Sequence, residues 1–98
     1  MDDLDTALLA AIAQRWKLKR LSVFGSVARG EATAGSDLDL LLDFTDDDER
    51  SLLDLARLKV ELEDALHRRV DLVEREAIVN PYRRRSILRD ARQIYAAD

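Results

Sequence analysis

The segment GSVARGEATAGSDLDLLL, residues 25–42, carries most of the structural information in this 98-residue chain. It begins with a glycine and a serine and ends in a run where aspartates and leucines alternate. Successive side chains on a strand point to opposite faces, so Asp37 and Asp39 project from one face, with Cα atoms roughly 6.5–7 Å apart. The same alternation points the intervening leucines toward a hydrophobic core: Leu38, Leu40 and Leu42.

Two carboxylates on one strand face repel each other unless a cation or a proton lies between them. Hard oxygen ligands favour Mg²⁺ or Mn²⁺ over zinc, so Asp37 and Asp39 indicate a site for such an ion. Asp71 is the best third ligand, because it lies in a short predicted strand where an Asp is otherwise disfavoured. Roughly thirty residues separate it from Asp39, which is the length of a strand–helix–strand unit. Glu74, at the end of that strand, is the weaker alternative.

Gly25 and Ser26 stand where a predicted strand stops and a short helix begins. A glycine there lets an anion approach the backbone, and free N–H groups with the Ser26 hydroxyl can bind a phosphate. A phosphate-binding turn beside metal-binding carboxylates is the arrangement that catalyses phosphoryl or nucleotidyl transfer. The P-loop alternative fails, because Glu31 follows Gly30 where that motif requires a lysine.

The sequence before and within this segment predicts two helices and two strands. A helix is expected over residues 2–17, with apolar residues at helical spacing and acidic residues at its start. A strand follows at 20–24, then a short helix from Gly25 that Gly30 ends. The second strand is expected at 37–44, rich in leucine and flanked by helix-breaking residues.

The sequence after residue 44 predicts two further helices and one strand. Ser51 and Asp54 form a capping-box pattern at the start of a helix that ends near residue 68. The leucines expected to face the core are Leu52, Leu55, Leu58, Leu62 and Leu66. A strand at 70–73 and one turn at 77–80 come next, and Pro81 then opens the last helix. The apolar face expected for that helix consists of Ile87, Leu88, Ala91, Ile94 and Tyr95.

The expected order α-β-α-β-α-β-α describes a mixed α/β (α+β) fold with a small sheet flanked by helices. The length allows a single domain, residues 1–98, with no room for a separate substrate domain. An enzyme of this size therefore receives its substrate, or half of its working site, from another chain.

Composition excludes several classes of protein. The chain has no cysteine, so disulfide scaffolds, thiol nucleophiles and cysteine-type zinc sites are ruled out. Its apolar runs fall far short of the roughly 20 residues needed to span a bilayer, and its N-terminus is acidic rather than basic. These features are compatible with a cytoplasmic protein. A net charge of −4 argues against a surface built for nucleic acid.

The pattern of Gly25-Ser26, ten residues, and then Asp37-Leu38-Asp39 resembles the signature of the nucleotidyltransferase superfamily related to DNA polymerase β. The whole 25–42 segment looks like its minimal nucleotidyltransferase (MNT) subfamily. The resemblance implies the nucleotidyltransferase fold, ATP as substrate, and two Mg²⁺ or Mn²⁺ ions. It implies a catalytic, metal-binding triad of Asp37, Asp39 and Asp71. The nucleotide-binding residues it implies are Gly25, Ser26, Arg29 and Ser36.

MNT proteins resemble this chain in size and are often partners of HEPN-domain toxins. The resemblance therefore implies an antitoxin that transfers AMP from ATP onto a tyrosine hydroxyl of a HEPN-type partner in a hetero-oligomer. Two alternatives remain open at this point. The chain could neutralise its partner by complex formation alone, or it could transfer a nucleotide to a small molecule. Membrane and nucleic-acid partners are not expected.

Several other residues have simpler interpretations. Asp46 to Glu49 lack the spacing of a calcium loop and are expected to form a solvated turn. His67, near a helix end, is not expected to be catalytic, and Trp16 is expected at the edge of the core. Arginines gather near the C-terminus and form either a solvated face or a basic strip for an acidic partner or the triphosphate: Arg83, Arg84, Arg85, Arg89 and Arg92.

Overall fold

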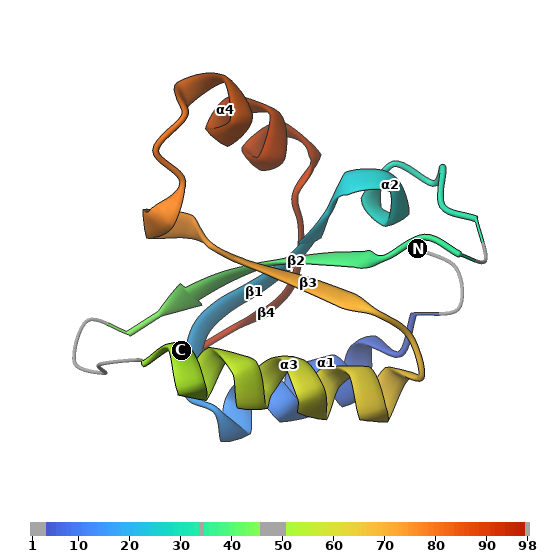
Figure 1. Cartoon of the computed structure of the whole chain (residues 1–98), viewed down its shortest axis with the longest axis vertical. Helices are drawn as coiled ribbons and strands as arrows, with labels where there is room; N and C mark the ends of the chain where they lie inside the picture. Colours follow the sequence, from blue (N-terminus) through green and yellow to red (C-terminus); the bar gives the residue numbers. More distant parts are fainter. Residues whose placement is uncertain (1–3, 34, 46–50, 98) are drawn as a thin grey trace.

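Four strands form one mixed sheet in the computed structural model, which describes residues 4–33, 35–45 and 51–97. The strands are β1 (Leu18–Phe24), β2 (Leu38–Phe44), β3 (Val70–Glu74) and β4 (Arg92–Ala96), in the spatial order β3-β2-β1-β4 (Figure 1). β2 and β3 run parallel, whereas β1 is antiparallel to both of its neighbours. The expected mixed α/β fold with a small sheet is thereby confirmed.

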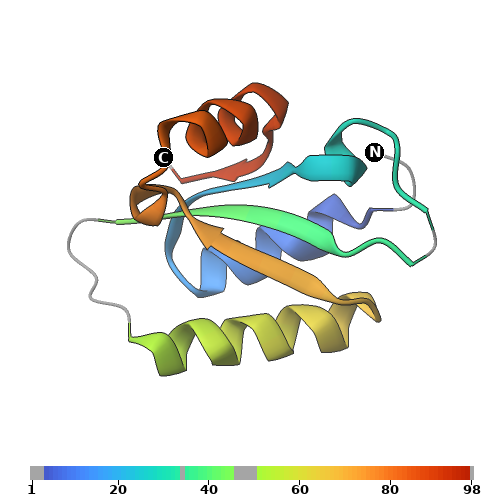
Figure 2. The same ribbon diagram turned by 45° about the horizontal axis from the view of Figure 1, so that its top comes forward.

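The helices divide between the two faces of this sheet. Helices α1 (Thr6–Arg15) and α3 (Leu52–Leu66) cover one face, and α4 (Pro81–Asp90) lies on the other (Figures 1 and 2). The short α2 (Gly25–Ala28) continues directly from the end of β1. A single 3₁₀ turn, η1 (Arg75–Ala77), leads from β3 toward α4. Among the described residues, no helix is long and apolar enough to cross a membrane.

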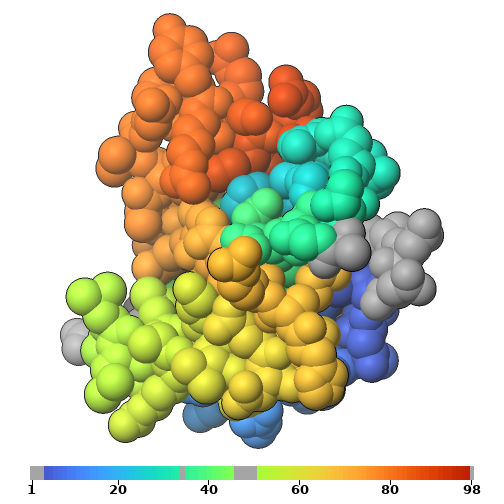
Figure 3. Space-filling model, turned by 45° about the vertical axis from the view of Figure 1, so that its right-hand side comes forward, coloured from blue at the N-terminus to red at the C-terminus, as the bar shows by residue number. Residues whose placement is uncertain are grey.

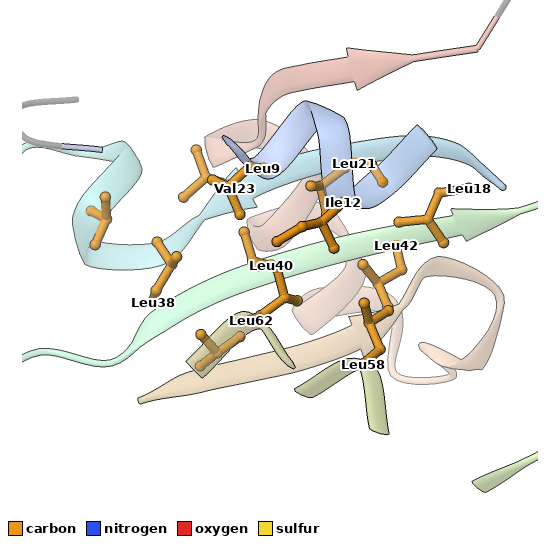
Figure 4. Packing of buried hydrophobic residues seen from close by; sticks show 13 residues of the cluster. Leu9, Ile12, Leu18, Leu21, Val23, Leu38, Leu40, Leu42, Leu58 and Leu62 are labelled. Carbon is orange, nitrogen blue, oxygen red and sulfur yellow. The ribbon is translucent and has the colours of Figure 1, made fainter. Parts of the chain in front are cut away.

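The main core lies between the sheet and the pair α1 and α3. The predicted inward-facing leucines of β2 are completely buried there, as Figure 4 shows for Leu38, Leu40 and Leu42. They meet Leu9 of α1 and Leu58 of α3. Burial of one such leucine side chain contributes roughly 1.5–3 kcal/mol, so this layer holds the sheet against both helices. Trp16 packs at the margin of this core, as expected.

A second, smaller core lies on the opposite sheet face, under α4. It contains the buried residues Phe24, Leu41, Ile78 and Ile87. Its members come from four separate elements or connections, so no periodic pattern within one segment predicts this second core. The uninterrupted run Leu40-Leu41-Leu42 is its one local sign, since a strand buried on both faces is apolar at successive positions.

Helix α3 begins as predicted and buries fewer leucines than predicted. Ser51 accepts a hydrogen bond from the Asp54 backbone N–H, and the Asp54 side chain accepts one from the Ser51 N–H, which completes the capping box. Leu58 and Leu62 are buried, and Leu55 and Leu66 pack beside them. The prediction for Leu52 is wrong: it is 85% exposed, because it lies in the first turn beyond the area that the sheet covers.

The other differences concern element boundaries and the C-terminal segment. The first helix begins at Thr6, because the Asp5 side chain caps it by accepting from the Leu8 N–H. The predicted turn at 77–80 is wrong, since the turn lies at Arg75–Ala77 instead. The predicted acidic turn at residues 46–49 lies outside the described residues.

The last predicted helix is too long, because the chain leaves α4 at Ala91 with an extended backbone, ψ 133°. Residues 92–96 then form β4, which pairs with the free edge of β1. Ile94 and Tyr95 consequently pack against the main core from a strand rather than from a helix face. Arg92 likewise belongs to β4 and not to the helix.

Candidate active site

The carboxylates singled out from the sequence meet where β1 ends and β2 and β3 begin. Phe24 pairs with Asp39 across the antiparallel strands, and Asp39 pairs with Asp71 across the parallel ones. Neighbouring strands lie about 4.8 Å apart, and residues in parallel register project from the same sheet face. Asp39 and Asp71 therefore stand side by side, on the face that α4 and the second core partly cover.

Gly25 is the residue that brings the backbone against these carboxylates. Its φ is +71°, a left-handed conformation that side chains rarely adopt. A Cβ placed on Gly25 would overlap a carboxylate oxygen of Asp39 and lie 3.1 Å from its Cγ. The glycine is thus required twice, once by its backbone angle and once by the space that Asp39 fills.

The electrostatics of this cluster centre on Asp39. Its pKa is raised, first by partial burial and then by the nearby charges of Asp71 and Asp37. Arg29 and Arg83 act in the opposite direction and lower the pKa of Asp39. A carboxyl that is half-buried among like charges is unfavourable by itself, and such perturbed groups are typical of functional sites.

The third and outermost carboxylate, Asp37, precedes β2 and is exposed. Its Oδ1 lies 3.4 Å from Nε of Arg69, so an arginine balances its charge. Within the part of the chain that the structure describes, no three carboxylate or histidine side chains converge closely enough to ligate one ion. The nearest approach to a ligand set is the in-register pair Asp39 and Asp71, with Asp37 two residues away.

Glu74, the alternative third carboxylate, lies at the far end of β3. It pairs with Leu42, whereas Asp71 pairs with Asp39. Because side chains alternate along a strand, Glu74 and Asp71 point to opposite sheet faces. The geometry thus favours Asp71 as the partner of Asp39.

Ser26 lies in the first turn of α2. Phe24, which precedes this helix, has an extended backbone and offers no side-chain acceptor to the first backbone N–H groups. The helix ends at Ala28 with Arg29 as its C-cap, and Gly30 follows with φ +74°, as the sequence predicted. The start of α2 consequently presents donors beside Asp39 that no side chain of the described residues caps.

Arg29 is held in place by two carboxylates. Its Nε donates to Glu31 at 2.9 Å, and its Nη1 donates to Oδ2 of Asp90 at 2.9 Å. The Arg29 guanidinium lowers the pKa of Asp90, whose side chain is only 12% exposed. This ion pair ties the end of α2 to the end of α4. Asp90 was not singled out from the sequence, where 61 residues separate it from Arg29.

Ser36 organises the loop before β2. Its hydroxyl accepts from the backbone N–H of Thr33 at 2.9 Å, and its carbonyl accepts from Nη2 of Arg68 at 3.0 Å. The Ser36 hydroxyl therefore takes part in the local turn that precedes β2. His67 takes a left-handed conformation, φ 55°, at the end of α3.

The chain belongs to the nucleotidyltransferase family, since the family model described as Nucleotidyltransferase domain matches residues 6–94. It is 40% identical over 79 residues to MJ0126 of Methanocaldococcus jannaschii, a relative to which protein adenylyltransferase activity is attributed. That match covers 81% of this chain and 79% of the relative. It is also 40% identical over 73 residues to the protein adenylyltransferase MntA of Thermococcus cleftensis, covering 74% and 72%.

Solved structures share this fold. One protein assigned as a minimal nucleotidyltransferase is 42% identical, with a TM-score of 0.70 over 94% of this chain and 98% of that one. A toxin–antitoxin structure with AMP-PNP gives a TM-score of 0.82 at 21% identity, over 97% of this chain and 76% of that one. The complex of tri-AMPylated Shewanella oneidensis HEPN toxin with MNT antitoxin gives 0.73 at 19% identity, over 99% and 74%. The last two likenesses show the fold alone.

Proposed function

We propose that this protein is an antitoxin of the MNT type, which transfers AMP from ATP onto a hydroxyl of a HEPN-type partner, with a tyrosine as the expected acceptor. The observation that carries the proposal is the joint placement of Gly25, Asp39 and Asp71 at the meeting point of three strands. Relatives named as protein adenylyltransferases support the reaction. We place this activity in the cytoplasm, where ATP is available.

The residues that would hold a divalent cation are Asp37, Asp39 and Asp71. Their oxygen atoms suit Mg²⁺ or Mn²⁺. The pKa of Asp39 is raised first by burial and then by repulsion from Asp71 and Asp37, and a cation would stabilise the charged form against both. Two ions are expected in a site of this class. A bound divalent cation supplies charge neutralisation for the triphosphate and lowers the pKa of the attacking hydroxyl.

The triphosphate would lie against the start of α2. There the uncapped backbone N–H groups and the Ser26 hydroxyl would donate to phosphate oxygens. Arg29 is the proposed cationic contact on the same side, and its ion pairs with Glu31 and Asp90 fix its position while they offset its charge. Ser36 would act indirectly, by fixing the loop that leads into Asp37.

In the proposed reaction the acceptor hydroxyl oxygen forms a bond to the α-phosphorus of ATP. The bond from that phosphorus to the oxygen bridging to the β-phosphate breaks, so AMP stays on the acceptor and pyrophosphate leaves. Asp71, which is exposed and pairs with Asp39 across the parallel strands, would take up the hydroxyl proton. Geometry and charge stabilisation supply most of the catalysis in such transfers.

The test is transfer of label from α-labelled ATP to the HEPN-type partner in the presence of Mg²⁺. The double variant Asp37→Asn, Asp39→Asn is expected to abolish labelling. A matched control, Asp64→Asn with Glu76→Gln, removes two exposed carboxylates elsewhere and is expected to label normally. Equal labelling by the Asp37/Asp39 variant would show that the site is assigned wrongly. Full inhibition of the toxin by that variant without ATP would favour neutralisation by complex formation alone.

A further inference from the structure

Positive charge is concentrated on one helix of this acidic protein. The chain has a net charge of −4, yet the ten residues of α4, PYRRRSILRD, carry four arginines and one aspartate. Arg84 is turned inward, where its Nη1 donates to the carbonyl of Arg75 at 2.9 Å. The remaining arginines of this helix are exposed. The distribution of charge over this molecule is therefore strongly uneven.

The outer face of α4 combines these arginines with exposed apolar groups. Tyr82, Arg85 and Arg89 recur every three or four residues, so they share one helix face, opposite the buried Ile87. Tyr82 is 80% exposed, and Val79, just before the helix, is 91% exposed. We name these four residues, Val79, Tyr82, Arg85 and Arg89, the α4 ridge.

The protein itself neutralises the ridge arginines only in part. Among the described residues, Arg85 forms no ion pair. Arg89 pairs with Asp90 at 3.5 Å, but Asp90 is shared with Arg29, which it contacts at 2.9 Å. Fold stability does not explain the ridge either, since α4 is attached through Ile87, Leu88 and the Asp90 ion pair on its other side. Exposed tyrosine and arginine side chains in one patch are typical of protein–protein contact surfaces.

The ridge adjoins the carboxylate site. Arg83, on the flank of the same helix, lies near enough to lower the pKa of Asp39. The Arg29–Asp90 ion pair joins the end of α4 to α2. In the space-filling view α4 rises as a projection directly beside the α2 segment (Figure 3). A protein bound along α4 would consequently have residues within reach of the bound nucleotide.

We propose that the α4 ridge docks an acidic segment of the protein that bears the acceptor hydroxyl. The inference rests on the proposed function, because it assumes that the acceptor belongs to another protein. Arg85 and Arg89 would pair with carboxylates of that segment, and Val79 and Tyr82 would cover its apolar atoms. RNA is the less favoured occupant, since the ridge has a single aromatic side chain and lies beside a cluster of carboxylates.

The probe is a fluorescein-labelled peptide, Glu-Glu-Asp-Tyr-Glu-Glu, titrated with the full chain at low salt and followed by fluorescence anisotropy. The ridge variant Arg85→Glu, Arg89→Glu is expected to bind it at least about tenfold more weakly, because attraction becomes repulsion. The matched control Arg57→Glu, Lys59→Glu makes the same charge change on exposed positions of α3 and is expected to bind within about twofold of the unaltered protein. Tyr82→Ala is expected to weaken binding without changing the net charge.

Each result decides the inference. It is overturned if the acidic peptide does not bind, if the ridge variant binds as the control does, or if a lysine-substituted peptide binds equally well. A single-stranded RNA that binds more tightly than the peptide, and loses binding in the ridge variant, would assign the ridge to nucleic acid instead. The ridge variant is also tested for binding of Mg²⁺ with AMP-PNP, and a loss of that binding would assign Arg85 and Arg89 to the nucleotide site and overturn the docking inference. If the peptide binds through the ridge but no AMP is transferred to any partner, the proposed function is wrong while the inferred docking surface is supported.

Discussion

At the scale of single residues, Gly25 is the position where backbone conformation and chemistry depend on each other most closely. Substitution by alanine forces a side chain into a left-handed backbone and into the Asp39 carboxylate. We expect Gly25→Ala to lower the free energy of unfolding by at least about 2 kcal/mol and to abolish nucleotidyl transfer. Chemical denaturation and the labelling assay measure the two effects separately.

Two other glycines provide the controls for this prediction. Gly30 shares the positive φ but has open space where an alanine Cβ would lie, so Gly30→Ala reports the backbone strain alone, about 1 kcal/mol. Gly35 has neither constraint, and its alanine variant is expected to be neutral or slightly stabilising. Equal losses in the Gly25 and Gly30 variants would show that the overlap with Asp39 is relieved without cost.

Asp39 is predicted to make the protein less stable at neutral pH. Its pKa in the folded state is raised, mainly by burial and then by Asp71, so the folded state favours the protonated form. The contribution of Asp39 to stability is therefore present below its unfolded pKa, about 3.9, and is lost as the pH rises through its higher folded pKa. Asp39→Asn should accordingly raise the melting temperature at neutral pH without metal, although it abolishes transfer.

This gain is expected to shrink as the pH falls, because the wild-type carboxyl then becomes neutral as well. Melting curves from pH 3 to pH 8 for both proteins measure it, in a buffer that contains a chelator. Asp64→Asn, at an exposed position on α3, is the comparison for the loss of a surface carboxylate. A melting temperature lowered by Asp39→Asn at neutral pH would contradict the prediction.

At the scale of elements, the same substitution is expected to have very different effects at two positions of α3. Leu58 is buried against the sheet, and its replacement by alanine is expected to cost about 3 kcal/mol of unfolding free energy. Leu52 is 85% exposed on the same helix, and its replacement is expected to change stability by less than about 0.5 kcal/mol. Urea denaturation compares the two variants directly, and a similar loss in both would mean that Leu52 is covered.

Elements that depend on residues close together in the sequence are predicted correctly, whereas elements that depend on distant parts of the chain are not. The capping box of α3 and the glycine end of α2 depend on residues a few positions apart, so the sequence predicts both. β4 does not, because Ile94 and Tyr95 continue the helical spacing of Ile87 and Ala91. What makes that segment a strand is the free edge of β1, which lies about 70 residues earlier in the chain.

At the scale of the whole molecule, some contacts of the candidate site follow from the order of strands and helices, whereas others arise only when distant elements pack together. The pairing of Asp39 with Asp71 could be predicted, since a strand–helix–strand unit places parallel strands side by side. The Arg29–Asp90 ion pair could not, because it joins two helices that only the folded chain brings together. The contact between Gly25 and the Asp39 carboxylate is of the second kind, although a glycine at that turn indicated some close approach.

The melting temperature of the whole chain with and without ligand tests which carboxylates take part in the proposed binding of nucleotide and cation. A ligand that binds only the folded state stabilises it, by about 2.7 kcal/mol at a concentration 100 times its Kd. For a protein of this size such a gain corresponds to a rise in melting temperature of roughly ten degrees or more. We expect Mg²⁺ with AMP-PNP to produce this rise, and a chelator to remove the part that requires the cation.

Asp71→Asn and Glu74→Gln then distinguish the two candidates for the third carboxylate. Both neutralise one charge on β3, but only Asp71 stands beside Asp39. The Asp71 variant is expected to lose most of the shift with Mg²⁺ and AMP-PNP, whereas the Glu74 variant keeps it. The opposite outcome would move the cation site toward the far end of β3, and it would separate the cation from the Gly25 turn where we propose that the triphosphate binds.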